Sequence, residues 1–73
     1  MARIEAKTEV MGLVAQIEGK IGDRIEAGGT VMFIESMKMQ IPVLIEEDAT
    51  LRQILVAVGD SVAEGQVVAV LEG

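Results

Sequence analysis

The sequence lacks several residue types on which most enzymes depend. It has no cysteine and no histidine, and its 73 residues include one aromatic residue, a phenylalanine, and one proline. Without cysteine there are no disulfide staples, thiolate chemistry or soft metal sites, and without histidine the usual general base is missing. A chain this short makes one small domain, 1–73, with no room for a separate substrate cleft. We therefore expect no catalytic residue, no metal ligand and a protein that is not itself an enzyme.

Basic charge and long apolar runs are also scarce. Twelve acidic and six basic residues give a formal net charge of −6, which disfavours binding to nucleic acid and to anionic membranes. The single aromatic side chain offers no platform for base stacking. No run of 18 apolar residues is present, and the first residues contain no signal-peptide core. We expect no nucleic-acid partner, no membrane partner and a cytoplasmic location.

Most of the sequence consists of two copies of one internal repeat. Residues 14–35 align without a gap with residues 51–72, an offset of 51 − 14 = 37 positions. One such unit is too short to bury its apolar face alone, so two copies are expected to pack about a pseudo-two-fold axis, with equivalent burial of Val31 and Val68 and of Ile25 and Val62. The identical pairs are Gln16/Gln53, Ile17/Ile54, Gly22/Gly59, Asp23/Asp60, Gly28/Gly65, Val31/Val68 and Glu35/Glu72.

Short runs rich in valine and isoleucine alternate with turns that contain glycine, a pattern typical of strands. A helix over 45–55 is an alternative interpretation, but the repeat equates 51–58 with a strand and we give that comparison more weight. Nearly continuous apolar character favours strands that are covered on most sides, as in a thin sandwich or flattened barrel. The sequence therefore predicts an all-β domain. The runs expected as strands are 13–17, 30–34, 51–58 and 67–71.

The segment Glu35-Ser36-Met37-Lys38-Met39 lies at the junction of the two repeats. With strands over 30–36 and 39–43, Met37 and Lys38 become the centre of a two-residue hairpin. Such hairpins favour Asn-Gly or Asp-Gly, because both central residues need positive φ, and a bulky residue held there costs on the order of 1 kcal/mol. Other turns of the chain do use glycine, which indicates that Met37 and Lys38 are kept for function. A lysine displayed in this way is typical of an attachment point rather than of an ordinary solvated surface.

The same segment, with Ile41-Pro42-Val43 after it and a Gly-Asp-x-hydrophobic-x-x-Gly motif at 22–28 and at 59–65, resembles the biotinyl domain of biotin-dependent carboxylases. This is the biotin carboxyl carrier protein family, and the resemblance covers essentially the whole chain. It implies a flattened barrel, or barrel-sandwich hybrid, of two four-stranded antiparallel sheets with quasi-two-fold symmetry. It also implies that the lysine hairpin lies at one end of the domain and both termini at the other.

The resemblance further implies roles for particular residues. Lys38 matches the lysine that is covalently biotinylated, and Glu35 matches an acidic position used in presenting that lysine to its ligase. The implied partners are biotin protein ligase, biotin carboxylase and carboxyltransferase, with an acyl-CoA carboxylase as the expected type, such as the acetyl-CoA carboxylase of fatty acid biosynthesis. We expect Met37 and Met39 to form an apolar collar that contacts partner enzymes, with packing beneath the hairpin as the alternative.

Other functions share this fold. A lipoyl domain has a lysine at the same tip but usually an aspartate immediately before it, where this chain has Met37. A domain that accepts both biotin and a lipoyl group is a second alternative, and a structural barrel-sandwich module without modification is a third. The acidic run Glu46-Glu47-Asp48 is expected to be a solvated loop rather than a docking patch. Met1 and the absence of a linker favour a stand-alone carrier over a domain of a larger subunit.

Overall fold

The structure, a computed structural model, describes residues 2–73, and within them it contains strands and turns only. The predicted all-β class is confirmed, and the alternative of a helix over 45–55 is wrong because residues 49–54 form a strand. In this part of the chain no helix is long and apolar enough to cross a membrane. The strands are β1 Arg3–Lys7, β2 Gly12–Ile17, β3 Arg24–Ile25, β4 Thr30–Ser36, β5 Met39–Leu44, β6 Ala49–Ile54, β7 Ser61–Val62 and β8 Val67–Glu72.

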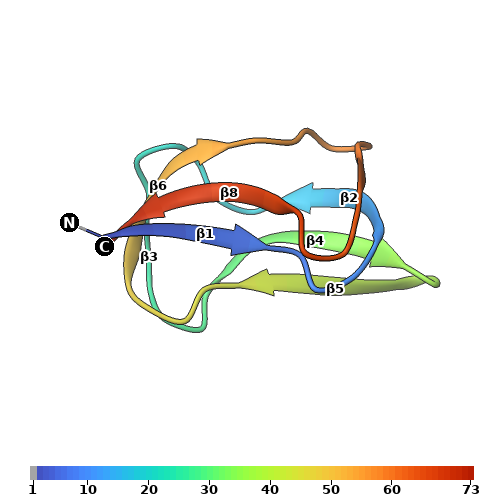
Figure 1. The fold of residues 1–73 in the computed structure, drawn as a ribbon, viewed down its shortest axis with the longest axis horizontal. Helices are drawn as coiled ribbons and strands as arrows, with labels where there is room; N and C mark the ends of the chain where they lie inside the picture. The colour runs from blue at the N-terminus through green and yellow to red at the C-terminus, as the bar shows by residue number, and fades with distance from the viewer. Residues whose placement is uncertain (1) are drawn as a thin grey trace.

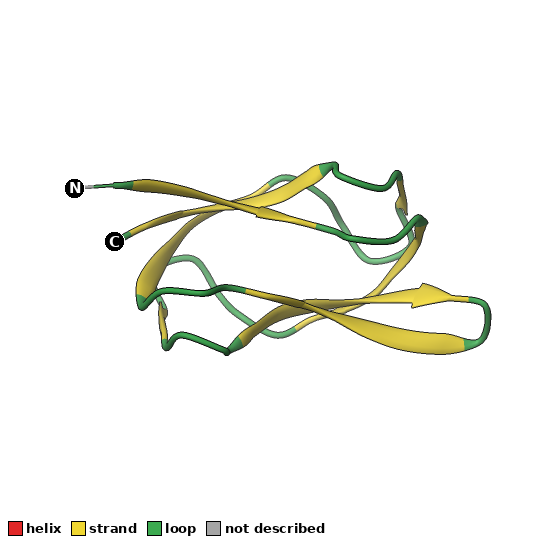
Figure 2. Cartoon of the chain, turned by 60° about the horizontal axis from the view of Figure 1, so that its bottom comes forward, coloured by secondary structure: helices red, strands yellow, loops and turns green. Residues whose placement is uncertain are grey.

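The strands form two antiparallel sheets that face each other (Figures 1 and 2). One sheet has the order β1-β8-β6-β3 and the other β5-β4-β2-β7. Each sheet therefore mixes strands from both halves of the chain, and every neighbouring pair of strands is antiparallel. The result is the flattened barrel-sandwich expected from the sequence.

The repeat is expressed as a pseudo-two-fold axis that exchanges the two sheets. The offset of 37 carries β2, β3 and β4 onto β6, β7 and β8, and it also relates β1 to β5. Even the irregularities repeat, because the register shifts between Val14 and Gln16 in β2 and at the equivalent place in β6. The halves interlock through matched hydrogen bonds, in which Gly22 N donates to Leu51 O at 2.7 Å and Gly59 N donates to Val14 O at 2.8 Å.

The core lies between the sheets and is made of apolar side chains from both halves. Val31 and Val68 are both fully buried, as predicted. The second predicted pair is unequal, because Val62 is buried and Ile25 only half-buried. The repeat is inexact in the segments that lead into β2 and β6: Val10 packs against the core, whereas the equivalent Glu47 is exposed. The side of the domain that carries Ile25 therefore has one apolar side chain fewer to cover it.

The domain is elongated, with principal extents of 35 × 19 × 18 Å. The two ends of the chain lie together at one end of the long axis, where Gly73 N donates to Ala2 O at 2.9 Å. The hairpin between β4 and β5 projects at the opposite end (Figure 1). This arrangement separates the hairpin from the point at which any covalent neighbour of the domain would be attached.

Candidate functional site

The hairpin between β4 and β5 has the predicted geometry. Ser36 and Met39 are opposed in the ladder, which leaves Met37 and Lys38 as the two residues of the turn. Their φ values are 51° and 66°, and they are the only residues other than glycine with positive φ in the described range 2–73. At the repeated turns of the two halves, positive φ is assigned to glycine, as in Gly22 and Gly59. The backbone at the hairpin tip is therefore held in a conformation that these side chains disfavour.

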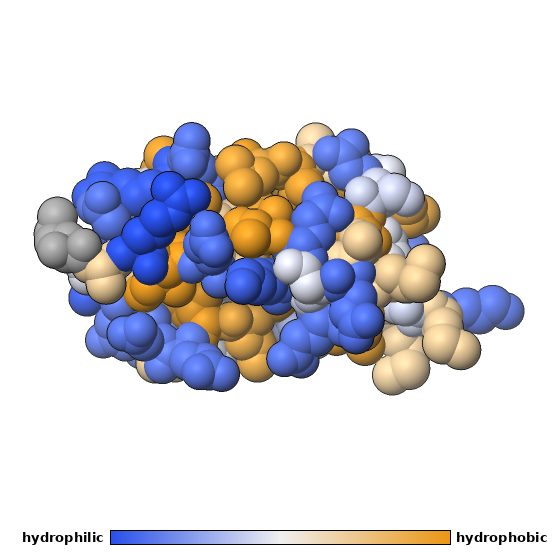
Figure 3. All heavy atoms as spheres, viewed as in Figure 1, coloured by the Kyte–Doolittle hydropathy of each residue, from blue (hydrophilic) through white to orange (hydrophobic). Residues whose placement is uncertain are grey.

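The side chains of the hairpin tip are directed into solvent. Met37 is 92% exposed and Met39 62% exposed, and Lys38 is exposed as well. Figure 3 shows moderately apolar side chains gathered at this end of the molecule, beside the hydrophilic group that projects furthest from it. Packing beneath the hairpin is thus excluded as the reason for Met37, because a side chain so exposed fills no gap in the core.

Glu35 lies in a row of exposed side chains that crosses the outer face of the sheet β5-β4-β2-β7. It opposes Leu13 of β2 on one side and Gln40 of β5 on the other. Its repeat mate is Glu72, whose Oε1 accepts a hydrogen bond from Arg52 Nε at 3.2 Å. The position equivalent to Arg52 is Ala15, and across residues 2–73 the Glu35 carboxylate makes no ion pair or hydrogen bond. The fold therefore neutralises one member of the pair and leaves the other available.

The start of β2 is pressed against the base of the hairpin. Gly12 has no side chain, and a Cβ there would clash with the carbonyl oxygen of Glu35 and lie 3.0 Å from Cγ2 of Ile34. The residues on either side, Met11 and Leu13, are apolar and exposed. Neither residue belongs to the hairpin motif of the sequence, and the signal for them is the difference between the two repeats, since the second has Asp48 and Thr50 at the equivalent positions.

The other two lysines are placed differently. Lys7 belongs to β1, and Lys20 lies in the loop before β3. Both are exposed, so exposure alone does not distinguish Lys38 from them. Lys38 differs in its backbone, because it occupies a two-residue turn at positive φ at the far end of a projecting hairpin.

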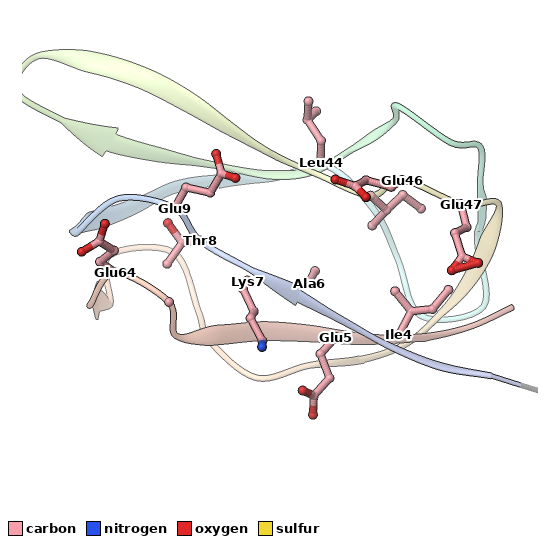
Figure 4. Close-up of a pocket in the computed structure, with 12 residues that line it drawn as sticks. Ile4, Glu5, Ala6, Lys7, Thr8, Glu9, Leu44, Glu46, Glu47 and Glu64 are labelled. Carbon is pink, nitrogen blue, oxygen red and sulfur yellow. The ribbon is translucent and has the colours of Figure 1, made fainter.

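A groove lies elsewhere on the described surface, between the edge strands β1 and β5 (Figure 4). Glutamates line much of it, and none of residues 35–39 contributes to it. Both strands have a partner on one side only, so the charged side chains along the groove and Pro42 of β5 protect open sheet edges from further pairing. Within residues 2–73 no cluster of three acidic side chains could hold a metal ion.

The acidic run Glu46-Glu47-Asp48 at one side of this groove is exposed throughout, in line with a solvated loop. Asp48 has a local structural task, because its Oδ1 accepts a hydrogen bond from Ala27 N at 2.8 Å. Edge protection and a local hydrogen bond therefore explain the groove and its acidic rim without a ligand. The hairpin tip remains the candidate site.

Fold and hairpin together define a small domain that displays a lysine, and comparison with known proteins agrees. The biotin/lipoyl family profile, described as "Biotin-requiring enzyme", matches residues 5–71. Over 67 residues the chain is 33% identical to the "Biotinylated protein TB7.3 homolog" of Mycobacterium leprae, covering 92% of this chain and 94% of that protein. It is 36% identical over 59 residues to the "Biotin/lipoyl attachment protein" of Bacillus subtilis, covering 81% of each. The chain belongs to the biotin/lipoyl attachment family.

The chain is also similar to parts of larger proteins, both in sequence and in solved structures. The chain is 30% identical over 66 residues to the dihydrolipoyllysine-residue succinyltransferase component of the 2-oxoglutarate dehydrogenase complex of Staphylococcus saprophyticus, covering 90% of this chain but 16% of that protein. The Kluyveromyces lactis urea carboxylase contains a region that superposes with a TM-score of 0.92 and 31% identity, covering 97% of this chain and 6% of the carboxylase. A single-chain, multi-domain long-chain acyl-CoA carboxylase shares the fold, with a TM-score of 0.88 and 23% identity over 96% of this chain and 7% of its own.

Proposed function

We propose that this chain is a biotin carboxyl carrier, with biotin attached to Nζ of Lys38. The observation that carries the proposal is the hairpin tip, where Met37 and Lys38 occupy positive φ at the solvent-exposed end of the domain. A turn chosen for stability would use Asn-Gly or Asp-Gly. The membership of the chain in the biotin/lipoyl family supports the same function.

The residues of the tip fit a covalently attached group. Covalent attachment needs one accessible nucleophile and no enclosing pocket, and Lys38 is exposed on a turn fixed by the ladder between β4 and β5. The ligase activates biotin as an adenylate, and the Lys38 amine attacks its carbonyl carbon, so that an amide bond forms and AMP leaves. The amine loses its protons as the amide forms, so a base of the ligase has to accept them.

The carrier itself contributes position and reach. Lys38 would hold the biotin, whose ureido group would supply the carrier of a carboxyl group between a biotin carboxylase site and a carboxyltransferase site. A tethered group visits both sites without diffusing away, so its effective concentration stays high. The eight-stranded body provides the rigid base, and the hairpin holds the attachment point at the end opposite the termini. We propose an acyl-CoA carboxylase of the acetyl-CoA type as the enzyme that this carrier serves.

We propose that Glu35 and the two methionines of the tip are recognised by different partner enzymes. We assign Glu35 to the ligase, since its carboxylate is exposed and unpaired within the described residues while its repeat mate is held by Arg52. We assign Met37 and Met39 to the carboxylase partners, as a flexible apolar collar around the modified lysine. Their exposure supports contact with a partner rather than a packing role.

A lipoyl group is the second candidate for the same lysine. The likeness to the succinyltransferase component and to the biotin/lipoyl attachment protein favours it, and Met37 immediately before Lys38 speaks against it. Intact mass of the protein, expressed with a biotin ligase or with a lipoate ligase and the matching acid, separates the possibilities. Addition of one biotinyl group only is the expected result, and addition of a lipoyl group only would replace biotin by lipoate in the proposal.

A further inference from the structure

Two exposed apolar side chains lie next to Glu35, outside the hairpin itself. Leu13 of β2 is directly opposed to Glu35 of β4, and residues opposed in a ladder have side chains on the same face. Leu13 is 47% exposed and Met11 71% exposed. Gly12 between them fits closely against the Glu35 carbonyl, so this segment stays at the base of the hairpin.

The pseudo-symmetry supplies an internal comparison for these positions. At the opposite end of the domain Thr50 opposes Glu72 in the same way that Leu13 opposes Glu35. The repeat equivalents of Met11 and Leu13 are Asp48 and Thr50, and the equivalent of Ala15 is the Arg52 that pairs with Glu72. The ladder pairing is the same at both ends, so a requirement of that pairing would act on both. The end that carries the lysine is apolar around a free carboxylate, and the other end is polar and neutralised.

Exposed apolar residues elsewhere are of two kinds. Leu44 and Leu55 also have charged repeat mates, Lys7 and Glu18, but neither leucine is opposed to Glu35 in the ladder, so the asymmetry alone does not define the surface. Ile21 is 58% exposed and its repeat mate Val58 is 62% exposed, and each immediately precedes the Gly-Asp pair of its own half. Because both members of that pair are apolar and exposed, the turn explains them. Met11 and Leu13 have no such explanation in the repeat.

We propose that Met11 and Leu13 form, together with Glu35, the surface on which the biotin ligase docks, and that the ligase meets it with apolar side chains around one cationic side chain. This inference rests on the proposed modification of Lys38. The ligase has to bring its adenylate to an amine that extends no further than one lysine side chain from the turn, so it must touch the base of the hairpin. The carboxylase sites meet a group at the end of the longer biotinyl arm and need no contact so deep.

The test replaces the two residues by those that the other repeat uses, Met11→Asp with Leu13→Thr, and measures biotinylation by a purified biotin protein ligase with ATP and biotin. We expect kcat/KM for the carrier to fall about tenfold or more through a higher KM, as for loss of central interface contacts, with kcat and the melting temperature nearly unchanged. The matched control is Ile21→Thr, which changes an exposed apolar residue at the end of the domain opposite the hairpin. Its kcat/KM should stay within about twofold of the wild-type value. If the double variant folds poorly, Leu13→Thr alone serves as the test variant. Threonine is a good strand former, and this strand position is half-exposed, so the single variant should fold.

The outcomes are distinct. Equal kcat/KM for wild type and Leu13→Thr, or an equal loss in the Ile21→Thr control, would overturn the docking surface while leaving the carrier function intact. A wild-type protein whose mass never increases under the same conditions would overturn the proposed function, and with it the docking surface.

Discussion

Replacing Met37 by asparagine and Lys38 by glycine should stabilise the domain while abolishing attachment of biotin. Both residues have positive φ, 51° and 66°, a region that costs on the order of 1 kcal/mol for a bulky side chain. Asparagine tolerates this region and glycine has no penalty there, although glycine adds about 0.4–1 kcal/mol of chain entropy to the unfolded state. The net gain is about 1 kcal/mol, which corresponds to a rise in melting temperature of roughly 4–8 °C for a domain of this size.

Thermal unfolding followed by far-ultraviolet circular dichroism measures the effect, with chemical denaturation as a second readout. Gly59→Ala is the matched control, because Gly59 has φ of 94° and a Cβ there would meet no atom within 4 Å. Its loss of stability, about 1 kcal/mol or more, therefore reports the backbone penalty less the entropy that alanine removes from the unfolded chain, with no steric clash added. A double variant that melts at or below the wild-type temperature would refute the reasoning, since it would mean that Met37 and Lys38 gain as much from their contacts as their backbone loses.

Three further predictions concern the charge of Glu35, the buried core and the exposed methionines of the hairpin. Glu35→Lys should slow biotinylation and leave the melting temperature nearly unchanged, because an exposed charge contributes little to stability; equal rates of labelling would remove Glu35 from ligase recognition. Val31→Ala and Val68→Ala should each lower the free energy of unfolding by about 1–3 kcal/mol, since both side chains are fully buried, and a near-zero loss at either would contradict the shared core. Leucine at both Met37 and Met39 should leave biotinylation intact and slow carboxyl transfer, and unchanged transfer rates in a reconstituted carboxylase would argue against the collar.

The sequence was sufficient to predict the hairpin and the overall class, because both depend on local pattern. Strands over 30–36 and from residue 39 onward leave two residues between them, and the structure has the same two-residue turn. The strand expected over 51–58 ends at Ile54 instead. The chain leaves the sheet there in the way that it does after β2, with Leu55 N donating to Val68 O at 2.9 Å. Apolar composition continues past this point and conceals the end of the strand.

The remaining elements could not be predicted from pattern alone. β3 and β7 have two residues each, which is too short for alternation to be recognised. β1 is an edge strand with charged residues at three of its five positions, so its composition suggests a loop. The equivalence of β1 and β5 is visible only in the fold, where Ala6 and Val43 are both buried although their strands share little sequence. The free carboxylate of Glu35 likewise emerges from comparison with the Arg52 ion pair at the other end.

The most direct test of the carrier function is the position of the modification. The chain has three lysines, Lys7, Lys20 and Lys38, all of them exposed, so accessibility alone would allow biotin on any of them. Peptide mapping by mass spectrometry of protein expressed with a biotin ligase, for wild type and for Lys38→Arg, decides between them. The hairpin account predicts one biotinyl group on Lys38 and none in the Lys38→Arg protein. Biotin on Lys7 or Lys20, or label that persists in Lys38→Arg, would contradict it.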